Sequence, residues 1–303
     1  MKRWTTDDMP NVQGKVAIVT GAGGLGYEDA LALAGAGARV IVAGRDVTKG
    51  EAAVAGIRQV HPKADVSFEV LDLAELASVK AFAGRMSERL AGLDILINNA
   101  GVMTPPQRLE TKDGFELQFG TNYLGHFALT AHLLPLIKKV RGRVISLSSV
   151  AARDGKINFD DLQAERSYVP MPVYAQSKLA CLMFAFELQK RSDAHGWGVT
   201  SIAAHPGISR TELLVDKPGA KTLVGMARKY AWFLFQPVAQ GALPTLFAAT
   251  SPDARPGGYY GPHAFREIRG YPHPAFVPAA AQDNDVSAKL WSTSEALAQI
   301  SFT

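Results

Sequence analysis

Residues 16–26 read VAIVTGAGGLG, an apolar run followed by a glycine-rich turn, and an alanine-rich stretch over residues 27–36 comes next. The apolar run predicts a buried strand and the alanine-rich stretch predicts a helix. Glycines between a strand and a helix let backbone N–H groups approach a pyrophosphate at the helix N-terminus. The segment therefore predicts a dinucleotide site, with a glycine turn without ligand or an S-adenosylmethionine loop as alternatives. The candidate contacts in this loop are Gly21, Gly23, Gly24, Leu25 and Gly26.

Strands and helices are expected to alternate along most of the chain. Further apolar runs predict strands at residues 39–43, 66–71, 93–97, 143–147 and 199–203. Helical patterns lie between them at residues 48–60, 76–90, 115–137 and 173–192. Strands that read as continuous apolar runs are typical of a parallel sheet that is covered on both faces. We therefore expect the α/β class, with a single Rossmann-type doubly wound parallel sheet and helices on both faces.

One domain over residues 1–303 accommodates this pattern. The chain has no internal repeat beyond the alternation and no low-complexity linker that would divide it. We expect residues 212–250 to cover the substrate, and residues 251–303 to form a C-terminal extension with a helix near residues 286–300.

Composition narrows the class of partner. The 303 residues are 47% hydrophobic and 20% charged, and 32 basic against 28 acidic residues give a net charge of +4. The charges are dispersed, without the Lys/Arg-rich runs of a nucleic-acid-binding surface, so we expect a small-molecule partner and no nucleic acid. The sequence has no run of about 18 apolar residues, so no membrane span is expected. Cys181 is the only cysteine, which excludes an internal disulfide and fits a cytoplasmic location.

The end of the second predicted strand selects between NAD and NADP. An NAD site places an acidic residue there to bind the ribose 2′-hydroxyl. Gly44 holds that position here and Arg45 follows, and a guanidinium suits a 2′-phosphate, so NADP is favoured over NAD. Asp46 is either the alternative acid or the N-cap of the next helix. At the end of the third strand, Asp72 and Leu73 are candidates for contact with the adenine, with a helix cap as the alternative for Asp72.

Tyr174 and Lys178 lie four residues apart in a predicted helix, so their side chains share a face. A lysine charge beside a phenol favours the phenolate. A tyrosine in that setting can exchange a proton with an alcohol or a carbonyl compound. Taken alone, such a pair is more often an exposed helix pair, and the upstream Ser148–Ser149 is more often a turn cap. Together with the glycine loop, the pair predicts a nicotinamide-dependent oxidoreductase.

These features resemble, in order, the motifs of the short-chain dehydrogenase/reductase family, from about residue 15 to residue 211. The motifs are the glycine loop, NNAG at residues 98–101, TNYLGHF at 121–127, ISLSS at 145–149, the tyrosine–lysine pair, and PGISRT at 206–211. The surroundings of Asn122 and Ser149, with residues 157–162, look most like the retinol-dehydrogenase-like branch.

Two features depart from the family pattern. The glycine loop is one residue shorter than the family's TGxxxGxG, so its turn is expected to be reshaped. Ser149 and Tyr174 are 25 residues apart, which is longer than the common spacing. The extra residues, within 150–172, are expected to form a flap beside the substrate.

The resemblance implies a role for each catalytic candidate. Tyr174 is the general acid/base, and Lys178 supports it and binds the nicotinamide ribose. Ser149 hydrogen-bonds the substrate oxygen, and Asn122 supports a water relay to Lys178. The cofactor contacts that the resemblance implies beyond the glycine loop are Asn99, Ala100, Gly101, Tyr174, Lys178, Pro206, Gly207, Ile208 and Thr211. No metal is implied, and the seven histidines show no ligand-like spacing.

The expected function is hydride transfer between NADP or NAD and an apolar alcohol, aldehyde or ketone. The alternative is a non-catalytic, dinucleotide-binding redox sensor on the same fold, which has no need of all four catalytic candidates. A methyltransferase is more distant because it leaves the tyrosine–lysine pair unexplained. The resemblance also implies a homodimer or homotetramer through residues 115–137 and 173–192, which the C-terminal tail could block.

Overall fold

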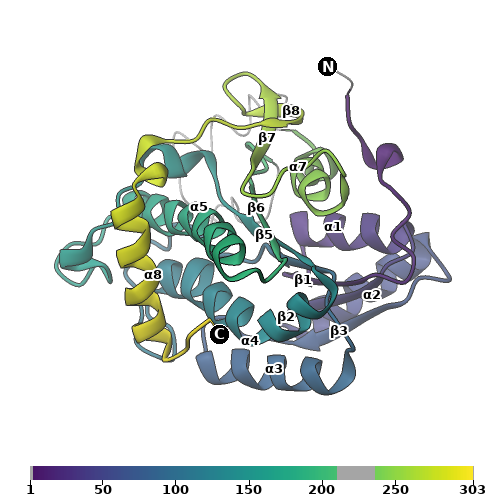
Figure 1. Cartoon of the computed structure of the whole chain (residues 1–303), viewed down its shortest axis with the longest axis horizontal. Coiled ribbons are helices and arrows are strands. Elements are labelled where there is room, and N and C mark those ends of the chain that lie inside the picture. The colour runs from purple at the N-terminus through teal and green to yellow at the C-terminus, as the bar shows by residue number, and fades with distance from the viewer. Residues whose placement is uncertain (1–2, 210–235, 303) are drawn as a thin grey trace.

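The computed structural model of the chain describes residues 3–209 and 236–302 (Figure 1). Within these residues, eight strands form one sheet with the order β3-β2-β1-β4-β5-β6-β7-β8. Strands β1 to β7 run parallel, and β8 is antiparallel to β7 at the edge. The strands are β1 (Val16–Thr20), β2 (Arg39–Gly44), β3 (Val66–Val70), β4 (Ile95–Asn98), β5 (Arg143–Leu147), β6 (Thr200–Ala204), β7 (Tyr259–Ala264) and β8 (Arg269–Pro274). The predicted doubly wound α/β sheet is confirmed, with one antiparallel edge strand added.

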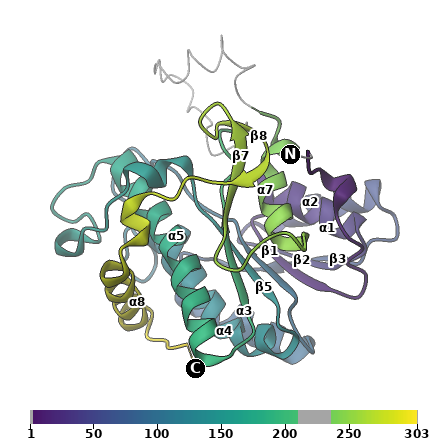
Figure 2. The same cartoon turned by 45° about the horizontal axis from the view of Figure 1, so that its top comes forward.

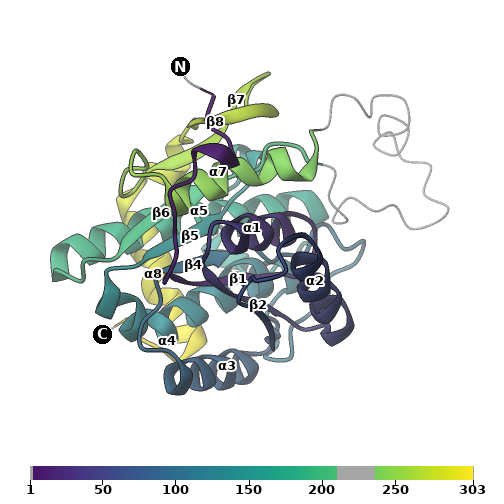
Figure 3. The same ribbon diagram turned by 90° about the vertical axis from the view of Figure 1, so that its right-hand side faces the viewer.

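Helices cover both faces of the sheet. The longer ones are α1 (Gly24–Gly35), α2 (Val47–Val60), α3 (Leu76–Arg89), α4 (Gly125–Val140), α5 (Pro170–His195), α7 (Val238–Thr250) and α8 (Asn284–Ala298). The shorter ones are η1 (Thr6–Asp8), η2 (Phe119–Leu124), η3 (Val150–Asp154), η4 (Phe159–Asp161) and η7 (Ala279–Gln282). Helices α1, α2 and α7 pack on one face, and α3, α4 and α5 pack on the other (Figures 1 and 3). Among the described residues, no helix has the length and apolar character to cross a membrane.

Alternate residues of each central strand pack into two separate hydrophobic cores, one on each face of the sheet. In β1, Ile18 belongs to the core beneath α3, α4 and α5, whereas Ala17 and Val19 belong to the core beneath α1, α2 and α7. Successive side chains of a strand point to opposite faces, so a strand that is covered on both sides needs apolar residues at every position. The continuous apolar runs of the sequence follow from this double burial.

The stretch that predicts one helix over residues 115–137 contains a change of helix type. Residues Phe119–Leu124 form one π-helical turn, η2, before α4 continues to Val140. A π turn carries an extra residue and leaves some backbone carbonyls free to accept hydrogen bonds from side chains. Asn122 lies in this turn and is buried.

The described part of the predicted C-terminal extension, residues 251–302, completes the sheet. Strand β7 pairs with β6, with Tyr259 opposite Ala203, and β8 pairs with β7 (Figure 2). Helix α8 packs against α5 and buries Trp291. The Trp291 ring stacks on Phe184 with the ring centroids 5.8 Å apart. The C-terminal segment therefore shares the sheet and the hydrophobic core with the rest of the described chain.

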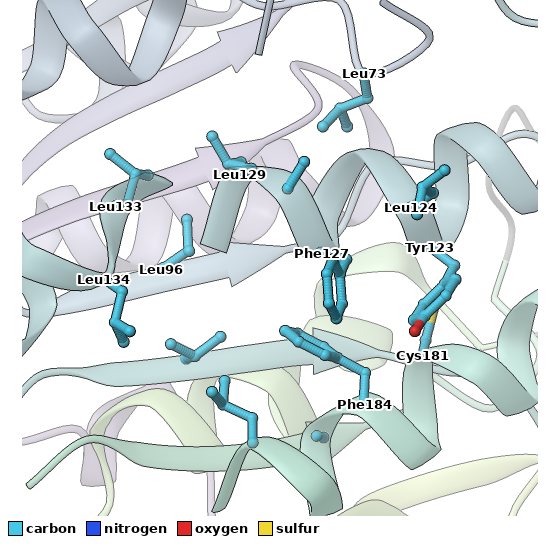
Figure 4. Packing of buried hydrophobic residues seen from close by; sticks show 14 of the residues in the cluster. Leu73, Leu96, Tyr123, Leu124, Phe127, Leu129, Leu133, Leu134, Cys181 and Phe184 are labelled. Atoms are coloured by element: carbon cyan, nitrogen blue, oxygen red, sulfur yellow. The ribbon is translucent and has the colours of Figure 1, made fainter. Parts of the chain in front are cut away.

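The aromatic part of the hydrophobic core beneath α3, α4 and α5 lies between α4 and α5. Tyr123, Phe127 and Phe184 pack side by side in it (Figure 4), with the rings of Phe127 and Phe184 5.5 Å apart. Trp291 from α8 contacts the same two phenylalanine rings. Helix α8 thus occupies part of the α5 surface through which a homodimer or homotetramer was expected, and the oligomer stays a prediction.

The predicted covering segment, residues 212–250, divides into two parts. Residues 212–235 lie outside the described residues. Residues Val238–Thr250 form α7, which packs against α1 and buries Ala242 and Leu246 in the core (Figure 3). This second part belongs to the helical layer of the fold and lines no part of the cavity described below.

Helix α1 buries one carboxyl group among apolar side chains. Asp29 of α1 has 0% exposure, and both of its carboxyl oxygens lack a hydrogen-bond partner among the described residues. Burial, with a further contribution from the neighbouring Glu28, raises the pKa of Asp29 well above its ordinary value. The folded protein therefore favours the protonated form more strongly than the unfolded chain does.

We expect Asp29→Asn to raise the free energy of unfolding at neutral pH. A carboxyl group with a raised folded-state pKa lowers stability as pH rises above its unfolded pKa, by about 1.4 kcal/mol for each unit of difference. The amide does not titrate, so the advantage of the variant should be smallest near about pH 4 and should grow above it. Urea unfolding across this range measures the difference, with the exposed Asp253→Asn as control. If the free energies of unfolding of wild type and Asp29→Asn change in parallel with pH, the raised pKa of Asp29 is contradicted.

Candidate active site

A cavity of about 770 Å³ opens at the carboxyl edge of the sheet. Residues that follow each of the strands β1 to β6 line it, together with residues of α5. The strand order reverses between β1 and β4, and open α/β sheets bind ligands at such a switch point. The volume is in the range of small-molecule and cofactor sites.

Most of the residues predicted from the sequence meet in this cavity. Those that line it are Gly21, Gly23, Gly24, Leu25, Arg45, Asp72, Leu73, Asn99, Ala100, Gly101, Ser149, Tyr174, Lys178, Pro206, Gly207 and Ile208. Gly26 and Asn122 lie behind the wall instead. Thr211 lies outside the described residues.

The glycine loop still places the N-terminus of α1 at the cavity, although the loop is one residue shorter than the family pattern. Gly23 is the N-cap of α1, and Gly21 has a φ of 94°, in the left-handed region that favours glycine. A Cβ on Gly26 would lie 2.2 Å from the carbonyl oxygen of Gly21. Gly26 therefore permits the helix to pack closely against the turn, and this explains why it does not line the cavity.

Thr20, which the sequence analysis did not single out, ties the ends of β1 and β4 together. Its Oγ1 accepts hydrogen bonds from the backbone N–H groups of Asn99 (2.9 Å) and Ala100 (3.0 Å). The side-chain amide of Asn99 donates to the Thr20 carbonyl oxygen (2.7 Å). These bonds fix the NNAG segment beside the glycine loop.

A buried histidine extends this network toward the π turn. His126 Nε2 lies 2.8 Å from Thr20 Oγ1, and its Nδ1 lies 2.9 Å from the backbone oxygen of Asn122. Burial lowers the pKa of His126 to about 4, so the ring is neutral near pH 7. A carbonyl only accepts, so Nδ1 donates to Asn122 and Nε2 accepts from the Thr20 hydroxyl.

Asn122 joins the end of β4 to α5. Its Oδ1 accepts from the N–H of Val102 (2.7 Å), and its Nδ2 donates to the Val102 carbonyl and to Ser177 Oγ, each at 3.0 Å. Its backbone oxygen accepts from His126 and from the Cys181 thiol (3.2 Å). The described contacts make Asn122 a structural link, and the water relay stays a prediction.

Ser149, Tyr174 and Lys178 form one end of the cavity. Lys178 Nζ donates to the Leu147 carbonyl (3.1 Å) and lies 6.0 Å from the centre of the Tyr174 ring. Ser149 Oγ accepts from the N–H of Ala151 (3.2 Å), which caps η3 and leaves the serine proton free to donate. A phenol, a hydroxyl and an ammonium therefore line the same cavity, and such a set can exchange a proton with a carbonyl or alcohol oxygen.

The opposite end of the cavity carries the basic side chain predicted from the sequence and a second one that was missed. Arg45 and Lys49 both line it. Asp46 Oδ1 accepts from the N–H of Lys49 (3.0 Å), so Asp46 is the N-cap of α2. Asp72 Oδ1 likewise accepts from the N–H of Ala74 (3.0 Å) in a local turn. Lys49 lies in the first turn of α2, the helix that follows β2 and Arg45, and this place in the sequence is the signal that would have found the second cation.

The insertion between Ser149 and Tyr174 contributes to the cavity only at its two ends. Its lining residues are Val150, Ala151, Asp154, Met171 and Pro172. Between them the chain turns away, and the carboxylate of Asp161 accepts backbone N–H groups of Glu165, Arg166 and Ser167. Among the described residues, no group of three or more His, Cys, Asp or Glu side chains is placed to hold a metal ion.

Comparison with known proteins matches residues 15–221 to the family model of the short chain dehydrogenases. The chain belongs to the short-chain dehydrogenase/reductase family. Retinol dehydrogenase 12 of Mus musculus is 41% identical over 289 residues, which cover 94% of this chain and 87% of that protein. Polyprenol dehydrogenase of Mus musculus is 39% identical over 290 residues, which cover 94% and 84%. A crystal structure of an uncharacterized protein from Mycobacterium Paratuberculosis superposes with a TM-score of 0.82 at 37% identity, covering 100% of both chains.

These findings make the protein a short-chain dehydrogenase/reductase enzyme similar to the retinol dehydrogenase branch, as the motifs predicted. The protein is therefore an oxidoreductase. The family uses nicotinamide dinucleotides in general. The cavity fits such a cofactor, because it runs from two basic side chains past a helix N-terminus to the tyrosine–lysine pair.

Proposed function

We propose that this enzyme transfers a hydride between a nicotinamide dinucleotide and an apolar alcohol, aldehyde or ketone, with Tyr174 as the general acid/base. One observation carries the proposal: Ser149, Tyr174 and Lys178 line the same cavity as the glycine loop. The bound nicotinamide supplies or accepts the hydride.

The chain's own residues handle the proton and the substrate oxygen. The Tyr174 hydroxyl gives its proton to that oxygen during reduction and takes it back during oxidation. Ser149 donates a hydrogen bond to the same oxygen and stabilises its developing charge. Lys178 uses one donor on Leu147 and has two left for the tyrosine and the cofactor ribose.

The cofactor is held by the segments after the strands. The N-terminus of α1 and the glycine loop take the pyrophosphate, and residues 99–101 and 206–208 flank the nicotinamide half. NADP is the proposed cofactor because Arg45 and Lys49 offer two cations for a 2′-phosphate. The carboxylate of Asp46 is engaged as a helix cap, which weakens its case as the acid of an NAD site.

The substrate is proposed to be apolar. Met103, Val150, Met171 and Pro172 line the cavity around the tyrosine. Apolar walls with few polar anchors are the usual form of such sites. The retinol and polyprenol dehydrogenases to which the chain is similar are named for long apolar alcohols. The cytoplasmic location remains a prediction from the single cysteine.

Tyr174→Phe should bind NADPH normally and lose turnover by about 100-fold or more, because only the transferable proton is removed. NADPH fluorescence titration and initial rates measure the two effects. Tyr271→Phe, which lies on β8 away from the cavity, is the matched control. Near wild-type rates in Tyr174→Phe would contradict the role. A protein that binds NADPH but turns over no carbonyl compound would support the redox-sensor alternative.

Arg45→Ala should weaken NADPH binding by about 1.5–3 kcal/mol and leave NADH binding nearly unchanged, because a charge-assisted phosphate contact is lost. Titration of both cofactors gives the comparison, and the exposed Lys63→Ala controls for the change in net charge. An equal loss for both cofactors, or tighter binding of NADH by the wild type, would contradict the choice of NADP.

With NADPH as the reductant, long-chain and ring-containing carbonyl compounds such as decanal and retinal should be reduced faster than polar sugars. The reason is the apolar wall around Tyr174. The measured quantity is kcat/KM across the panel. A preference for the sugars would refute the apolar site while leaving the hydride chemistry in place.

A further inference from the structure

The turn between β7 and β8 has an unusual backbone. Phe265, Arg266 and Glu267 follow one another with φ values of 52°, 54° and 66°. Residues with a side chain rarely enter this left-handed region, and runs of them are rarer still. Such strain persists only where surrounding contacts hold it. The turn also lies beyond residues 15–221, which match the family model.

Glu267 supplies those contacts. Its Oε2 accepts from Arg153 Nη2 (2.7 Å) and from His205 Nε2 (2.9 Å), and its Oε1 accepts from the N–H of Phe276 (2.7 Å). Although partial burial raises the pKa of Glu267, these hydrogen bonds and charges lower it to about 2. The side chain is therefore a carboxylate with three donors from three separate segments.

The His205 contact reaches the loop proposed to flank the nicotinamide. His205 Nδ1 accepts from the N–H of Gly207 (3.2 Å), so the proton on Nε2 points to Glu267. The same loop meets the turn directly, because the N–H of Ile208 donates to the Ile268 carbonyl (2.9 Å). A Cβ on Gly207 would lie 2.3 Å from that carbonyl oxygen, so only glycine permits this approach.

The Arg153 contact reaches the segment that carries Ser149. Arg153 belongs to η3, and Ser149 is the N-cap of that helix. The guanidinium also donates to the Arg266 carbonyl (3.2 Å) and lies 5.6 Å from the Phe276 ring centre. Its side chain is 29% exposed and that of Glu267 is 17% exposed, so the pair is partly shielded from water.

We propose that Glu267 is a positioning residue, which holds the Ser149 segment and the 206–208 loop at a fixed separation across the cavity. The inference rests on the proposed function, because it assigns these two segments to the substrate oxygen and the nicotinamide. The C-terminal hairpin, outside the part that matches the family model, thereby sets the geometry of the hydride transfer. A small displacement of either segment lowers the rate without removing any group that reacts.

Glu267→Gln keeps the shape of the side chain and removes its charge. We expect kcat to fall about tenfold or more, since the two segments lose their common anchor. NADPH should bind about threefold to tenfold more weakly. Adenosine 2′,5′-bisphosphate, which lacks the nicotinamide half, should bind within about twofold of wild type. Glu110→Gln, which alters the exposed ion pair with Arg108, is the matched control and should change none of these quantities.

Variants of Arg153 give a second test of the proposal that does not depend on Glu267→Gln. Arg153→Met should lower kcat to a similar extent, and Glu267→Gln with Arg153→Met should be no worse than the poorer single variant. Arg153→Lys keeps a donor for the carboxylate and should recover most of the rate. The comparison of the methionine and lysine variants carries the test if Glu267→Gln does not fold.

Three results would overturn the proposal. They are equal weakening of NADPH and of the bisphosphate by Glu267→Gln, fully additive effects in the double variant, or a fall in thermal stability with kcat and NADPH affinity unchanged. The two binding measurements need no turnover. If the wild type reduces no carbonyl compound, the proposed function fails while the positioning of the nicotinamide half is still tested.

Discussion

A chain of hydrogen bonds that starts at the Thr20 hydroxyl holds the two halves of the site together. Thr20 accepts from the NNAG segment and donates to His126, which in turn donates to the backbone oxygen of Asn122. The Asn122 side chain continues to Ser177 on α5, one residue before Lys178. A buried polar network stabilises a fold only when its members are satisfied, and these contacts satisfy each other. The glycine loop and the end of the cavity that holds Tyr174 and Lys178 are thus positioned by one continuous structure.

Much of the fold could be predicted because double burial leaves a strong mark on the sequence. The strands β1 to β6 fall within two residues of their predicted bounds, since each had to be apolar on both faces. Strands β7 and β8 do not show continuous apolar runs, because Gly261 and Pro262 interrupt one and Gly270 and Pro272 interrupt the other. The π turn was equally hidden, since one extra residue shifts the apolar spacing of a long helical stretch by only a single position.

The residues of the site likewise divide into those that the sequence could predict and those that it could not. Residues at the end of a strand, such as Arg45 and Asp72, could be placed at the cavity from topology, whereas Ser149 was placed by the family resemblance. Residues that act through long-range contacts could not be placed in either way: Thr20 depends on the pairing of β1 with β4, and Glu267 depends on a hairpin whose strands were not predicted. Gly26 and Asn122 have the expected motifs, yet both lie behind the cavity wall because they support neighbouring segments.

The cavity gathers the ends of six parallel strands, and this has a consequence for the stability of the whole protein. These segments are far apart in the chain, so a molecule that contacts them all recognises only the folded state. Occupancy is then linked to folding: a ligand at a hundredfold excess over its Kd adds about 2.7 kcal/mol to the free energy of unfolding. The abundance of the dinucleotide in its surroundings would decide how much destabilising sequence change this chain tolerates.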